Sequence, residues 1–175
     1  MKSLRVILVR HGGTASSRER RVEGSRDVPL SPEARLRAER VASALAAPAP
    51  AAVYASPVAR ARETAEIIAK PHRLSVSEDE AFGALASGED LGAARARALA
   101  GIERLRAAHA GETVVVVSHG VIVRLVVLDA LGLPPDRLGA VHATAAGITE
   151  IEYGGGWTTV HRMNTLQHLE PAREP

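Results

Sequence analysis

The sequence predicts an α/β fold: a three-layer α/β/α sandwich with a mainly parallel central sheet and a short helical cover. Two observations predict it. The apolar runs VILV at 6–9 and VVVV at 114–117 lack polar alternation, which indicates strands buried on both faces. Segments with helical patterning alternate with such short apolar segments, as in domains built from strand–helix–strand units.

The elements can be assigned in chain order. Residues 4–9 form the first strand. Ser31-Pro32-Glu33 starts a helix, because serine caps a helix N-terminus and proline fits its first turn. That helix reaches about residue 46. The remaining elements are a strand at 53–55, a helix capped by Ser56-Pro57 and ending near 69, a strand at 73–77, a helix at 90–108, a strand at 113–117, a helix to about 131, and strands at 147–153 and 157–162.

The composition limits the function. A chain of 175 residues without repeats or linkers suits one domain, which we expect over 1–170, followed by a flexible tail at 171–175. Aromatic residues make up only 2%, which counts against a nucleic-acid partner bound by base stacking. Without cysteine there is no disulfide, thiol nucleophile or cysteine-bound metal.

The apolar run near the N-terminus is too short for a signal peptide or a membrane span, so we expect a cytoplasmic protein without a membrane partner. No histidine pair has the spacing of a metal site, and no cofactor or metal is implied.

Polar clusters follow four of the expected strands. Arg10 and His11 follow the first, Ser56 and Arg60 the second, the acidic run 77–80 the third, and His119 the fourth. The carboxyl ends of parallel strands meet at one edge of a sheet, where α/β proteins bind their ligands. We therefore expect these clusters to converge.

Two arginines, two histidines and a carboxylate suit phosphoryl transfer through histidine. Arg10 and Arg60 can each hold phosphate oxygens in bidentate fashion, with further donors from backbone N–H groups at Gly12 and near Gly120. Their charges favour a neutral His11, which is the nucleophilic form. A carboxyl group of the acidic run can protonate the leaving alkoxide and then activate water.

These motifs resemble the histidine phosphatase superfamily, which includes cofactor-dependent phosphoglycerate mutases. Arg10-His11-Gly12 with Thr14 matches the RHGxT signature, and the similarity extends over almost the whole chain. The other matching positions are Gly24, Asp27, Pro29, Leu30 and Ser31, then Tyr54-Ala55-Ser56-Pro57 with Arg60, Thr64 and Ala65, then Ser118-His119-Gly120, Asn164 and His168-Leu169.

The resemblance implies His11 as the nucleophile that becomes phosphohistidine, and Arg10, Arg60 and His119 as the phosphate pocket. It implies substrate contacts at Thr14 and Ser17. The family's proton donor lies four residues before a glycine, a register that Asp79 takes relative to Gly83. Glu80 is the competing donor.

The chain departs from the family in places that bear on function. Gly13 stands where glutamate or glutamine is usual, and Ser17 where asparagine is common. The helical insertion expected between Gly83 and Gly88 is almost missing. A mutase must keep water from its phosphohistidine, so this short cover favours hydrolysis of phosphate monoesters.

Several alternatives remain beside a phosphatase for small phosphorylated molecules. They are a protein-phosphohistidine phosphatase acting on a phosphoprotein, a phosphoglycerate mutase-type phosphotransferase, and a non-catalytic module that binds phosphate ligands. His142, before the fifth strand, is a further residue that could reach the pocket.

Overall fold

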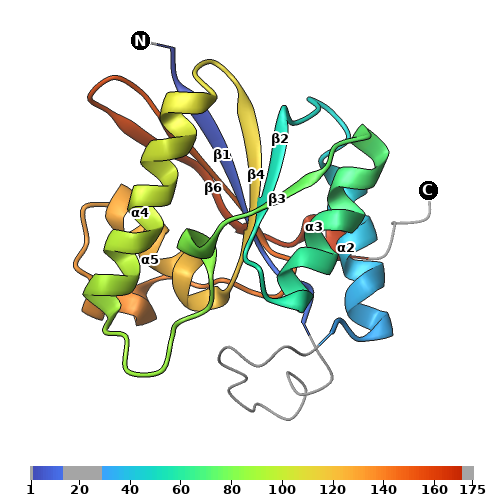
Figure 1. The fold of residues 1–175 in the computed structure, drawn as a ribbon, viewed down its shortest axis with the longest axis horizontal. Helices are drawn as coiled ribbons and strands as arrows, with labels where there is room; N and C mark the ends of the chain where they lie inside the picture. Colours follow the sequence, from blue (N-terminus) through green and yellow to red (C-terminus); the bar gives the residue numbers. More distant parts are fainter. Residues whose placement is uncertain (1, 14–28, 171–175) are drawn as a thin grey trace.

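The computed structural model describes residues 2–13 and 29–170. Six strands form one sheet in the order β3-β2-β4-β1-β5-β6 (Figure 1). In chain order the strands are β1 (Leu4–Arg10), β2 (Ala52–Ala55), β3 (Val76–Glu78), β4 (Thr113–Ser118), β5 (Ile148–Tyr153) and β6 (Thr158–Thr165). The pairings among β1 to β4 are parallel, whereas β5 runs antiparallel to both β1 and β6. The expected mainly parallel sheet is confirmed.

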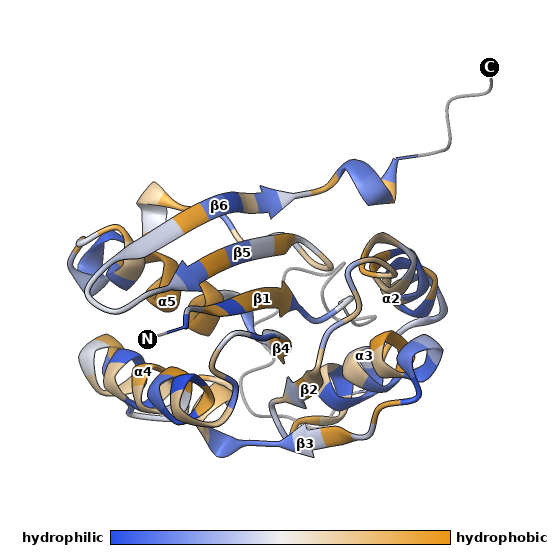
Figure 2. Cartoon of the chain, turned by 90° about the horizontal axis from the view of Figure 1, so that it is seen from above, coloured by the Kyte–Doolittle hydropathy of each residue, from blue (hydrophilic) through white to orange (hydrophobic). Residues whose placement is uncertain are grey.

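Helices cover both faces of this sheet, as Figures 1 and 2 show. The helices are α2 (Pro32–Ala44), α3 (Ala59–Ala69), α4 (Leu91–Ala108) and α5 (Gly120–Ala130). Successive side chains of a strand point to opposite faces. Val6 and Leu8 accordingly pack in the cluster that includes α4 and α5, whereas Ile7 and Val9 pack in the cluster that includes α2 and α3. This explains the continuous apolar run in β1.

The start of the first helix is as predicted, because the Ser31 hydroxyl accepts the Ala34 N–H at 3.2 Å. The expected start of the second helix is wrong. The N-cap of α3 is Val58, and no side chain caps it. The Ser56 hydroxyl instead accepts the Val58 N–H and contacts His119, so it belongs to the carboxyl edge of the sheet.

The third strand is shorter and later than expected. Arg73 has a left-handed backbone (φ 58°) that ends a short 3₁₀ turn, so the chain is not extended there. β3 consequently begins at Val76 and includes Glu78. The last strand, by contrast, runs beyond its expected end at 162, to Thr165. No helix of the described residues is both long and apolar enough to cross a membrane.

Candidate active site

The ends of β1 and β4 bring two histidines together. Arg10 pairs with Ser118 in the parallel ladder, and the next backbone bond runs from the His11 N–H to the Ser118 carbonyl at 3.0 Å. His11 and His119 therefore leave adjacent strands side by side. Their ring centroids lie 5.2 Å apart with the planes 61° from parallel, and both residues are buried.

Arg60 lies between the two imidazoles. It sits in the first turn of α3 and is only 3% exposed. Its Nε–H donates to His11 Nε2 at 3.2 Å, and its Nη2 lies 3.3 Å from His119 Nδ1. The predicted meeting of these three side chains from three separate segments is thus present in the structure.

The surroundings of His11 favour its neutral form. The Arg60 Nε–H points at Nε2 and the Gly13 N–H at Nδ1, each at 3.2 Å. A neutral ring has one bare nitrogen and can accept one of these N–H groups at a time, whereas a doubly protonated ring can accept neither. Burial first, then the neighbouring His119 and the guanidinium groups of Arg60 and Arg10, hold the pKa of His11 well below its ordinary value. The ring is therefore neutral, the form that can attack phosphorus, at neutral pH.

His119 is neutral for the same reasons. Burial, followed by the guanidinium groups of Arg60, Arg10 and Arg97, lowers the pKa of His119 to about 3. Its Nε2 lies 2.8 Å from the hydroxyl of Ser56, a residue with no exposed surface. Ser56 was expected both as a helix cap and as part of the polar cluster after the second strand, but its contact with His119 was not predicted.

Arg10 closes another side of the cluster. Its Nη1 donates to the Ala143 carbonyl at 2.7 Å, which fixes the guanidinium against the segment before β5. Gly120 allows this approach, since a Cβ there would lie 3.3 Å from Arg10 Nε. His142, the neighbour of Ala143, is exposed.

The expected backbone donor at Gly12 has a different partner. The Gly12 N–H donates to Thr64 Oγ1 at 3.2 Å, and that hydroxyl donates to the Arg60 carbonyl at 2.7 Å. Thr64 thereby ties the end of β1 to the helix that carries Arg60. Its position one turn after Arg60 is the sequence signal for this role. Thr14 and Ser17, expected as substrate contacts, lie outside the described residues, as does the tail 171–175.

The first acidic side chain that follows β3, that of Asp79, has partners other than the two histidines. The Asp79 carboxylate accepts the Ala81 N–H at 2.8 Å and binds Arg104 of α4 through both oxygens. Glu80 is exposed. Among the described residues, neither carboxylate is hydrogen-bonded to His11 or His119. The structure therefore brings four of the six predicted catalytic residues together and leaves the two acids outside these hydrogen bonds.

The short cover is a loop held by Arg97 of α4. This guanidinium binds the Glu89 carboxylate through two bonds of 2.8 Å. It also donates to four loop carbonyls at 2.8 to 3.4 Å, those of Glu80, Ala81, Gly83 and Ala84. A further bond, from the Ser118 hydroxyl to the Phe82 carbonyl, ties the loop to β4. The loop is thus fixed to α4 through Arg97 and to β4 through Ser118.

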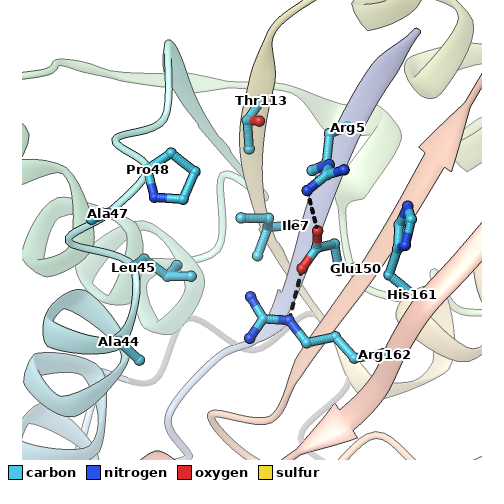
Figure 3. Close-up of a pocket in the computed structure, with 10 residues that line it drawn as sticks. All are labelled: Arg5, Ile7, Ala44, Leu45, Ala47, Pro48, Thr113, Glu150, His161 and Arg162. Atoms are coloured by element: carbon cyan, nitrogen blue, oxygen red, sulfur yellow. Dashed lines mark ion pairs between the residues drawn. The ribbon is translucent and has the colours of Figure 1, made fainter.

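A separate pocket of about 390 Å³ lies at the other end of the parallel strands (Figure 3). Its lining includes Arg5 and Thr113, which pair at the start of β1 and β4. The two arginines in it, Arg5 and Arg162, both bind Glu150, at 3.0 and 2.8 Å. Within residues 2–13 and 29–170, no three His, Asp or Glu side chains are grouped to hold a metal ion.

Comparison with known proteins finds a protein family whose model matches most of this chain. The model of the histidine phosphatase superfamily (branch 1) matches residues 6–84 and 78–166. The phosphoglycerate mutase-like protein 4 of Arabidopsis thaliana is 30% identical over 202 positions, covering 94% of this chain and 86% of that protein. This alignment is longer than the chain's 175 residues, so the plant protein carries segments that this chain lacks.

Solved structures agree with the fold. YhfR of Bacillus stearothermophilus superposes with a TM-score of 0.90 at 27% identity, covering 95% of this chain and all of that one. A phosphoserine phosphatase mutant of Entamoeba histolytica, in complex with phosphoserine, superposes with a TM-score of 0.88 at 21% identity and the same coverages. At that identity the second likeness concerns the fold alone.

Proposed function

This chain belongs to the histidine phosphatase superfamily, and we propose that it hydrolyses phosphate monoesters through a phosphohistidine formed on His11. One observation carries the proposal: a buried, neutral imidazole whose Nε2 lies 3.2 Å from the Nε of a buried arginine. A nucleophile and the cation that attracts its substrate are thereby placed together. The match of the histidine phosphatase family model over residues 6–84 and 78–166 supports the reaction class.

The reaction has two steps. In the first, the lone pair of His11 Nε2 forms a bond to phosphorus while the ester P–O bond breaks, and the leaving oxygen takes a proton from a carboxyl group. In the second, the resulting carboxylate takes a proton from water, whose oxygen attacks phosphorus. The P–N bond then breaks, which releases phosphate and restores neutral His11.

The arginines stabilise the charge of the phosphoryl group. Arg60 and Arg10 approach the cluster from α3 and β1, and in this buried setting their attraction for a dianion is stronger than it would be in water. His119, at the start of α5, completes the phosphate pocket together with that helix N-terminus at Gly120.

Asp79 is our proposed proton donor, with Glu80 as the alternative. We expect Asp79→Asn to slow hydrolysis of an alkyl phosphate, a poor leaving group, far more than hydrolysis of an aryl phosphate. Glu80→Gln is the matched comparison, since it neutralises the adjacent carboxylate. If both variants have equal and small effects, neither residue is the donor.

Hydrolysis is favoured over phosphoryl transfer between substrate positions by the short loop at 83–90. A mutase has to enclose a phosphorylated intermediate, and a loop pinned by Arg97 has little chain with which to close over one. Relatives of this chain are named as phosphoglycerate mutase-like or as probable phosphoglycerate mutases, so mutase activity is the second candidate function. A small phosphorylated metabolite is the expected substrate, with a phosphorylated protein side chain as the alternative.

The decisive assay measures phosphate release from an aryl phosphate with EDTA present. His11→Ala should abolish turnover and prevent the formation of an acid-labile protein phosphate in a rapid-quench experiment. His161→Ala is the matched control, because His161 lies on β6 in the pocket at the far end of the strands, and it should retain activity. Activity that survives in His11→Ala would refute the proposal, and conversion between phosphoglycerates without phosphate release would favour the mutase.

A further inference from the structure

The Ser56 hydroxyl is buried at the base of the histidine–arginine cluster. It accepts the Val58 N–H at 3.3 Å and lies 2.8 Å from His119 Nε2. No part of Ser56 is exposed. The other nitrogen of the same ring, Nδ1, lies 3.3 Å from Arg60 Nη2. His119 is thus held at both nitrogens, by a hydroxyl on one side and a guanidinium on the other.

These two partners decide where the ring carries its proton. A guanidinium can only donate, so the nitrogen that faces Arg60 has to accept and carries no proton. Because His119 is neutral, its single proton lies on Nε2 and is donated to the Ser56 oxygen. A serine hydroxyl can accept this proton, whereas an alanine methyl group cannot.

We infer that Ser56 is a positioning residue, which holds His119 in the Nε2–H tautomer so that the bare Nδ1 faces Arg60. The opposite tautomer would point an N–H of His119 directly at an N–H of Arg60. The guanidinium would then have to turn, and its Nε would leave His11 Nε2, the atom that attacks phosphorus in the proposed reaction. A chain of contacts therefore runs from Ser56 through His119 and Arg60 to His11.

This inference rests on the proposed function only in its kinetic consequence. Ser56→Ala leaves the buried Nε2–H without an acceptor, which makes the Nδ1–H tautomer competitive. We expect a fall in kcat/KM for an aryl phosphate of roughly tenfold, the size of effect typical of a lost buried hydrogen bond.

The direct test is the ¹⁵N spectrum of labelled histidines near neutral pH, with His119 assigned by its absence in His119→Gln. Protein with the natural sequence should show His119 protonated at Nε2 and bare at Nδ1. Ser56→Ala should lose this single pattern. Ser118→Ala is the matched control, because it removes an equally buried hydroxyl that donates to the Phe82 carbonyl, and it should keep the pattern.

The outcomes are distinct. A proton on Nδ1 of His119 in the unaltered protein, or a doubly protonated ring, would overturn the inference without any variant having to fold. An unchanged His119 pattern in Ser56→Ala would overturn it as well. If the protein has no phosphatase activity, the proposed function fails, whereas the tautomer measurement still decides the role of Ser56.

Discussion

The stability of the protein should fall as the pH is lowered from about 7 to about 5, and His119 should account for a measurable part of the loss. In the unfolded chain His119 titrates near its ordinary value of 6.5, whereas in the fold its pKa is lowered to about 3. Between these values the unfolded chain binds a proton that the folded protein does not. Acid therefore favours unfolding.

The magnitude follows from the two pKa values. One proton taken up on unfolding changes the free energy of unfolding by about 1.4 kcal/mol per pH unit. Integrated from about pH 7 to about pH 5, His119 alone costs about 2 kcal/mol. His11, whose pKa is also lowered by burial and by neighbouring cations, acts in the same direction. Carboxylates contribute little in this range because their ordinary pKa values lie below it.

The assay is urea unfolding at several pH values for the natural sequence and for His119→Gln. Only the change in unfolding free energy between the two ends of the range is compared, so that a different starting stability of the variant does not matter. The variant should lose about 2 kcal/mol less than the natural sequence. Equal losses in both proteins would show that His119 is not held neutral by the fold, and the reasoning on its tautomer would fail too.

Two further substitutions test the geometry around the site. Gly12→Ala places a Cβ 2.5 Å from the Ala34 carbonyl oxygen of α2, so it should cost about 1–3 kcal/mol in urea unfolding and reduce turnover, whereas Gly139→Ala meets nothing within 4 Å and should be neutral. Arg97→Leu removes the anchor of the loop at 80–89 and should cost about 2 kcal/mol, discounted because the side chain is 27% exposed. Arg37→Leu breaks an exposed ion pair within α2 and should cost under about 0.5 kcal/mol; similar losses in both arginine variants would contradict the anchoring role.

The central part of the fold could be predicted because uniform apolar runs have few alternatives. Val6 to Val9 can be buried on both faces only in a covered sheet, and the structure confirms this. The carboxyl-edge rule then brought Arg10, His11, Arg60 and His119 together without any knowledge of side-chain contacts.

Two polar contacts at this edge were not predicted, and each joins groups that are far apart in the sequence. Ser56 was expected to cap the second helix, but it does not cap α3, and its hydroxyl contacts the buried ring of His119 at the start of α5. Asp79 has the register of the family's proton donor, and its carboxylate binds Arg104, about one turn before the end of α4. Partners that are far apart in sequence leave no periodic signal.

The burial of Arg60 has a consequence for ligand affinity. Its guanidinium has already lost its hydration shell, and the imidazoles of His11 and His119 take the place of that water before any substrate arrives. The cost of dehydrating the cation is therefore met during folding and not during association. In the proposed reaction the incoming oxyanion meets a preorganised charge, and its binding to the folded protein stabilises that protein against unfolding.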